Sequence, residues 1–113
     1  MYSLKNIRKI RGLDGAGVTA SIYRDGVRIG WVQVPADGGR ALFTFDADGE
    51  RSSFERFVEG WWIVASSRIT LDPLAVEFAS SDPGFALRLP AKMRYWVTSW
   101  VTGTAVSKLE VAA

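Results

Sequence analysis

Apolar and polar side chains alternate along much of the first 45 residues, which predicts β-structure. The alternation is clearest over Val18–Tyr23 and again over Val27–Val34, and a period of two places one set of side chains on each face of a strand. Asp25-Gly26 stands between the two runs. This pair favours a type I′ turn, because both central residues of that turn need a positive φ. The pattern therefore predicts a β-hairpin over residues 18–34.

Shorter runs on either side of the hairpin predict two further strands. Leu4–Ile10 mixes apolar and basic residues, and Ala41–Phe45 places its two phenylalanines on one face. The three glycines within residues 12–17 predict a loop before the hairpin, and Pro35–Gly39 predicts a turn after it. Together these segments predict a small antiparallel sheet.

The apolar period changes from two to that of a helix after residue 50. Apolar side chains recur at i, i+3, i+4, i+7 and i+8, a continuous stripe on one helix face: Phe54, Phe57, Val58, Trp61 and Trp62. Ser52 and Glu55 have the spacing of a capping box, with Ser52 as the N-cap, and Gly60 marks the expected end. We therefore predict a helix over residues 53–62 that covers one side of the sheet.

A second helical stripe lies near the C-terminus. It has the same spacing: Met93, Trp96, Val97, Trp100 and Val101. Thr98 and Thr102 are β-branched and favour a strand, but periodicity outweighs propensity here, so we predict a helix over about residues 91–102. Alternation over residues 75–89 predicts a second hairpin, with a short helix over 73–80 as the alternative.

These elements indicate the α+β class in a single domain, residues 1–113. The sheet, led by the hairpin at 18–34, is expected to pack against the helix at 53–62 and the C-terminal helix near 91–102. A chain of 113 residues with 48% apolar residues can bury one core of this kind. The chain has no apolar run close to the roughly 20 residues that span a bilayer, so we expect a cytoplasmic protein without membrane contact.

Histidine and cysteine are both absent from the sequence, which excludes several kinds of chemistry. Thiolate zinc sites, disulfides, thiol catalysis and Ser-His-Asp catalysis all need one of these residues. Asp46, Asp48 and Glu50 resemble a calcium loop, but the glycine and the glutamate that such a loop needs are missing from its sixth and twelfth positions. The glycines of residues 12–17 precede a strand, whereas a dinucleotide site needs a helix there. We expect no enzyme, no cofactor and no metal.

The first strand carries the main basic cluster. Lys5, Arg8, Lys9 and Arg11 lie within seven residues, although the whole chain has a net charge of only +2. One interpretation is a nucleic-acid-binding segment in which these cations contact phosphates and Tyr2 or Tyr23 stacks on bases. The other is an edge strand on which basic side chains prevent pairing with another sheet.

Tryptophan is the most unusual component, with five in the chain. We expect Trp31 and one of the neighbours Trp61 and Trp62 in the core, because adjacent side chains cannot point the same way. Tryptophan is enriched at protein interfaces, so the remaining rings indicate a protein-binding surface. Its candidate residues are Trp96, Trp100 and Trp62.

The N-terminal sequence resembles a known group of proteins. Ser3–Gly12, Asp14-Gly15 and Ala20–Gly26 are similar to the opening of small bacterial and phage-associated proteins without assigned function. The resemblance covers about the first 30 residues and the Phe54–Val58 segment, and it fades after Trp62. It brings no catalytic residues. It implies a mobile-element setting, where small proteins often bind and block host machinery.

Three functions follow in order of expectation. The first is a small non-enzymatic protein-binding module, a phage or mobile-element inhibitor whose partner is a host or defence protein or a second copy of the chain. The alternative is a nucleic-acid-binding accessory protein that uses the basic N-terminal segment. An enzyme of another type comes third, because no residue spacing in the chain points to one.

Overall fold

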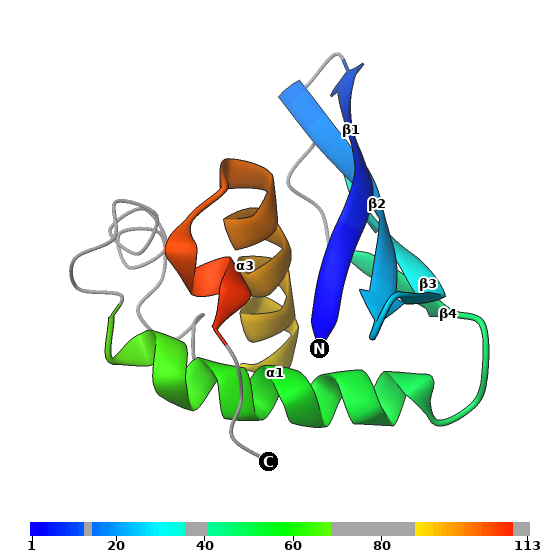
Figure 1. The fold of residues 1–113 in the computed structure, drawn as a ribbon. Helices are drawn as coiled ribbons and strands as arrows, with labels where there is room; N and C mark the ends of the chain where they lie inside the picture. The colour runs from blue at the N-terminus through cyan, green and yellow to red at the C-terminus, as the bar shows by residue number, and fades with distance from the viewer. Residues whose placement is uncertain (13–14, 36–40, 69–87, 110–113) are drawn as a thin grey trace. The chain divides into compact units, whose positions relative to one another are not determined.

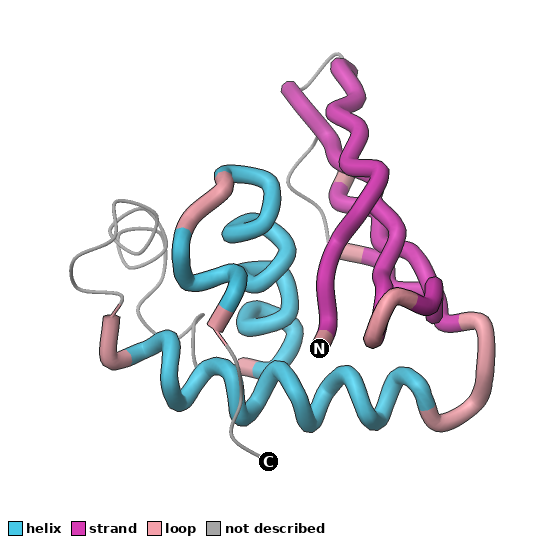
Figure 2. Tube along the Cα trace, viewed as in Figure 1, coloured by secondary structure: helices cyan, strands magenta, loops and turns pink. Residues whose placement is uncertain are grey.

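The computed structural model describes residues 1–12, 15–35, 41–68 and 88–109 (Figure 1). Within them lie a four-stranded antiparallel sheet and two α-helices, which confirms the α+β class (Figure 2). The chain divides into two compact units, Met1–Arg51 and Ser52–Ala113, and each is described by itself. The turn at 35–39 and the second hairpin or helix over 73–89 lie almost wholly outside the described residues. The single domain stays a prediction.

The sheet has the strand order β1-β2-β3-β4, with each strand antiparallel to its neighbour. The strands are β1 (Tyr2–Gly12), β2 (Gly15–Arg24), β3 (Val27–Val34) and β4 (Leu42–Phe45). Asp25 and Gly26 join β2 to β3 with φ values of 52° and 84°. Positive φ at both residues is what a type I′ turn requires, so the hairpin prediction is confirmed.

The glycine-rich loop expected over residues 12–17 is wrong in its extent. β1 continues to Gly12 and β2 begins at Gly15, and these two glycines pair across the sheet, as do Ile10 and Gly17. Glycine weakens a strand because it adds no side chain to pack, but its backbone still forms the ladder hydrogen bonds. Within the described residues, the part of β2 before Val18 pairs with β1 alone.

A β-bulge interrupts β1 and explains its mixed sequence period. Lys5 pairs with Ser21 and Arg8 pairs with Thr19, so two residues of β1 lie opposite the single residue between them on β2. Asn6, in the bulge, has a φ of 55°. Asparagine tolerates this left-handed conformation better than most residues. The extra residue places Lys5 and Arg8 on the same face of the sheet although they are three positions apart.

One face of the sheet is apolar and buried. Leu4 lies opposite Ile22 and Ala20 opposite Val32, and none of the four is more than 4% exposed. Trp31 lies opposite Ser21 on the other face and is only half-buried. The expectation that Trp31 belongs to the core is therefore wrong. The side of the sheet on which Trp31 lies is set by its pairing with Ser21 of β2, which the sequence of β3 alone does not reveal.

Helix α1 spans Glu50–Ser66, longer than the predicted helix at both ends. It begins before Ser52, so Ser52 is not its N-cap, and it continues through Gly60. A glycine in a helix interior costs about 1 kcal/mol relative to alanine. The buried stripe continues past it to Ala65, and burial of that stripe offsets the cost.

Helix α3 spans Leu89–Thr102, which confirms the helical interpretation of the C-terminal stripe. Gly103 ends it in the left-handed conformation, with a φ of 71°. A 3-10 turn, η3 (Ala105–Lys108), follows, and the carbonyl oxygen of Val106 accepts a 2.7 Å hydrogen bond from the indole nitrogen of Trp61. Trp61 is fully buried and Trp62 half-buried, as expected for adjacent side chains.

Candidate functional site

The sheet face opposite the apolar one carries charged, polar and aromatic side chains, and we call it the polar face. Register assigns residues of all four strands to it, and all of its charged, polar and aromatic residues are exposed or half-buried. The members used below are Lys5, Arg8, Ser21, Tyr23, Arg28, Trp31 and Gln33. Figure 1 shows how β1 to β4 form the single twisted sheet that supports this face.

A cation–π contact joins β1 to β2 on the polar face. The ammonium nitrogen of Lys5 lies 4.7 Å from the centroid of the Tyr23 ring. An exposed contact of this kind contributes about 0.5–1 kcal/mol. Tyr23 itself is half-buried. Tyr2, the other tyrosine suggested by the sequence as a stacking residue, lies on the apolar side and is only 8% exposed.

The strands that build this face have an unusual charge composition. They contain six basic residues and no Asp or Glu: Lys5, Arg8, Lys9, Arg11, Arg24 and Arg28. Among the residues that the structure describes, the acids next to these strands in the chain stand in turns and at the start of α1. A cluster of one charge sign raises the local concentration of oppositely charged ligands.

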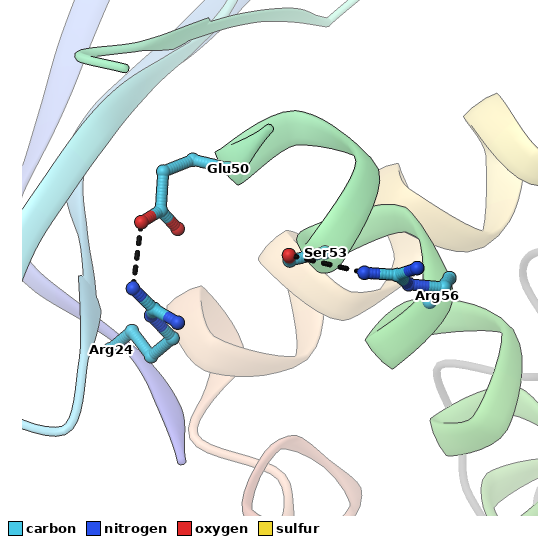
Figure 3. Close-up of polar contacts among 4 residues, drawn as sticks. All are labelled: Arg24, Glu50, Ser53 and Arg56. Carbon is cyan, nitrogen blue, oxygen red and sulfur yellow. Dashed lines mark hydrogen bonds and ion pairs between the residues drawn. The ribbon is translucent and has the colours of Figure 1, made fainter. Parts of the chain in front are cut away.

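Two of these six cations have carboxylate partners. Arg24 donates to Glu50 at 2.7 Å, and Figure 3 shows this pair; the same figure shows Arg56 donating to the hydroxyl of Ser53 within α1. Arg28 lies 3.7 Å from Asp46, and both side chains are about half exposed. Such an exposed pair is worth at most about 1 kcal/mol, so an anionic ligand can compete for Arg28.

The four cations of β1 form no ion pair within the described residues. The structure separates them into two groups. Lys5 and Arg8 lie on the polar face, whereas Lys9 pairs with Val18 and Arg11 with Ala16, on the side of the apolar residues. The basic cluster of the sequence is thus not one patch.

The candidate protein-binding tryptophans also separate. Trp96 is fully buried, and its ring lies 5.2 Å from Phe54 and 5.9 Å from each of Phe57 and Trp100. Trp96 is therefore part of the core of the second unit. Trp100 remains half-buried, and its indole N–H is buried without a hydrogen-bond acceptor in the described part of the chain.

Trp62 keeps partial exposure near the end of α1. Its ring packs 5.7 Å from Tyr95, and the next residue, Ile63, is 74% exposed. Ile63 lies outside the helical stripe, so the apolar spacing gives no sign that it is an exposed surface residue. Trp62 and Ile63 form a small apolar surface.

The acidic residues after β4 do not assemble a site. Asp46 and Glu50 face arginines, and no group of three His, Cys, Asp or Glu side chains suited to a metal occurs among the residues that the structure describes. At the hairpin turn, the N-terminal ammonium group lowers the pKa of Asp25 by hydrogen bonding and charge attraction. In the described part of the chain, neither helix is long and apolar enough to cross a membrane.

Comparison with protein-family models, curated proteins and solved structures finds no match for this chain. The polar face is then the feature with the most defined chemistry. It combines two cations, Lys5 and Arg8, that form no ion pair with the described residues, two partly exposed aromatic rings and the uncharged polar side chains of Ser21 and Gln33.

Proposed function

We propose that the protein binds nucleic acid through the polar face of its sheet, as a cytoplasmic accessory protein without catalytic activity. The observation that carries the proposal is the position of Lys5 over the Tyr23 ring, on a sheet whose strands hold six cations and no acid. Phosphate contacts supply most of the affinity of nucleic-acid binding, and aromatic rings beside them contact bases.

The positions of the cations support binding on one particular face of the sheet. Lys5 and Arg8 share the polar face with Tyr23 and lack carboxylate partners among the described residues. An unpaired exposed cation can contact a phosphate without first breaking an ion pair. Lys9 and Arg11 have the same charge and lie on the same strand, but on the other side of the sheet.

This arrangement provides a matched experiment. The double variant Lys5→Gln/Arg8→Gln and the control Lys9→Gln/Arg11→Gln each lower the net charge by two units. Binding of a fluorescent oligonucleotide is measured by anisotropy over a series of salt concentrations. We expect the first variant to flatten the log–log salt slope by about 0.7–0.9 for each lost phosphate contact. The control should retain most of the wild-type slope.

Two results would contradict the proposal. If both variants lost the same amount of salt slope, the protein would attract nucleic acid by its general charge and not through a defined face. Absence of binding even at low salt, together with aggregation of the Lys5→Gln/Arg8→Gln variant, would instead support basic residues that protect an edge strand.

Protein binding remains a second candidate, supported by the Trp62–Ile63 surface and by partly exposed Trp100. Its partner would be a host or defence protein, or a second copy of the chain, in the mobile-element setting that the N-terminal resemblance implies. Ile63→Glu should leave the fold intact, since Ile63 is 74% exposed, and should abolish capture of a partner from nuclease-treated lysate. Capture unchanged by Ile63→Glu would exclude this surface.

A further inference from the structure

We infer that the polar face binds single-stranded nucleic acid, with bases stacked on Tyr23 and Trp31. The inference rests on the nucleic-acid binding proposed above and names the form of ligand. Three cations on this face, Lys5, Arg8 and Arg28, complement a polyanion, and the strands that form the face contain no Asp or Glu. Two partly exposed aromatic rings on the same face require, in addition, bases that are free to leave their own stack.

The two rings lie on the same face of adjacent strands. Trp31 of β3 lies opposite Ser21 of β2, and Tyr23 follows two residues later on the same face, opposite Arg28. The register shifts between Ile22 and Tyr23, where β3 has one extra residue, so a β-bulge separates the positions of the two rings, and each ring is a separate place for one base. Both rings are half-buried, so each is held by its surroundings while part of it stays accessible.

The surroundings of the rings suit a base and its phosphate. Ser21 is small and Gln33 can donate and accept hydrogen bonds, so neither blocks a flat ligand. Lys5 lies over Tyr23 from an exposed position. A base that stacks on this ring replaces the ammonium group, which is then available to an adjacent phosphate. Arg8 and Arg28 lie on the same face as further phosphate contacts.

A duplex does not fit this chemistry equally well. Its bases are stacked inside the helix and present only their edges in the grooves, so they cannot stack on rings that lie on a sheet face. The rival geometry is a two-stranded ribbon in the major groove. Lys9 and Arg11 would then be the contacting cations, because they lie near the end of the β1–β2 pair, where Gly15–Gly17 of β2 pair with β1 alone in the described part of the sheet.

The test compares three labelled ligands by anisotropy: oligothymidylate, a duplex of equal length and an abasic deoxyribose-phosphate oligomer. The wild type should bind oligothymidylate most tightly. Tyr23→Leu and Trp31→Leu should each weaken that binding by about 5- to 150-fold, the range for one stacked base, with little change in salt slope. Trp62→Leu, which removes a half-buried tryptophan of the second unit, is the matched control and should bind as the wild type does.

The abasic oligomer keeps the inference falsifiable if a variant fails to fold, because it removes the bases without changing the protein. We expect the wild type to bind it more weakly than either single aromatic variant binds oligothymidylate, because the abasic oligomer loses the stacking on both rings whereas each variant loses one. Equal binding of abasic and normal strands, or tighter binding of duplex, would overturn the inference and leave the proposed function intact. Failure of all three ligands to bind would overturn both.

Discussion

Replacement of Gly30 by alanine tests the pairing of β4 with β3. Gly30 lies in the middle of β3, opposite Phe45. A Cβ atom at this position would come within 2.2 Å of the carbonyl oxygen of Thr44 and 3.1 Å of the Cα of Phe45. Both are backbone atoms, so no side-chain rotation can relieve the overlap. Either β3 distorts locally or β4 moves away.

The expected cost can be estimated from two opposing effects. Overpacking of this kind costs about 1–3 kcal/mol. Replacing glycine by alanine also reduces the entropy of the unfolded chain, which stabilises the fold by about 0.4–1 kcal/mol where the native conformation is compatible. Because a backbone atom lies only 2.2 Å from the added Cβ, we take the upper part of the overpacking range, about 2–3 kcal/mol, so Gly30→Ala should lower the free energy of unfolding by about 1–2.6 kcal/mol. Amide protons of β4 should exchange faster with solvent.

Urea denaturation followed by circular dichroism measures the free energy of unfolding, and hydrogen exchange measures how readily the amide protons of β4 exchange. Gly26→Ala is the control, because a Cβ atom there meets nothing within 4 Å and the cost comes only from the φ of +84°. Gly26→Asn should recover part of that cost, since asparagine tolerates a positive φ, whereas Gly30→Ser should be no better than Gly30→Ala. A Gly30→Ala protein as stable as the wild type, with unchanged exchange in β4, would refute the close approach of the two strands.

Further predictions concern the turn, the core and the bulge. Gly26→Val should destabilise by about 1 kcal/mol or more in urea, because a β-branched residue resists positive φ; wild-type stability would argue against the type I′ turn. Trp96→Ala should cost about 3–5 kcal/mol, since Trp96 is fully buried; a variant that melts at the wild-type temperature would remove it from the core. The lowered pKa of Asp25 means that its pair with the N-terminus stabilises the fold above the normal pKa of 3.8 and is lost as the pH falls. Asp25→Asn should therefore reduce the acid dependence of the melting temperature, and an unchanged pH profile would count against the pair. Asn6→Val should disfavour the bulge and turn Arg8 away from the polar face, so Arg8→Gln should weaken oligonucleotide binding less in that background; equal losses in both backgrounds would contradict this role of the bulge.

Periodicity predicted the elements in which one buried face is continuous. The hairpin was readable because Asp25-Gly26 specifies the turn and the flanking alternation specifies the strands. Helix α3 was readable because Trp96 and its neighbours repeat at helical spacing. Burial of that stripe outweighs the strand preference of Thr98 and Thr102, whose hydroxyls donate to backbone oxygens one turn earlier.

The limits of the helices were harder to predict, because local signals compete with packing. Ser52 and Gly60 are sound boundary signals, yet α1 begins earlier and ends later. Its buried residues continue to Ala65. The free energy of burying that face is larger than the cost of one glycine, and no rule based on a single residue includes it.

The composition of the polar face could not be derived from the sequence, because it depends on register. A bulge changes which side chains share a face, and its location is known only once the partner strand is known. The sequence therefore grouped Lys5, Arg8, Lys9 and Arg11 as one cluster, whereas the pairing of β1 with β2 divides them. The expectation that Trp31 lies in the core is wrong for a similar reason, because only the pairing of Trp31 with Ser21 shows which face it is on.

The bulge itself adds support to the proposed site. Asn6 is one of two non-glycine residues in the described chain with positive φ, and the other, Asp25, is in the hairpin turn. A non-glycine residue in this conformation carries a strain of about 1–2 kcal/mol, and strained residues tend to occur where function requires a particular geometry. Without the extra residue, alternation would place Arg8 on the apolar side. With it, Arg8 joins Lys5 and Tyr23 on the polar face. Two like charges on one face repel each other, so this arrangement adds no stability by itself. The proposed polyanionic ligand on that face would give the strain a function.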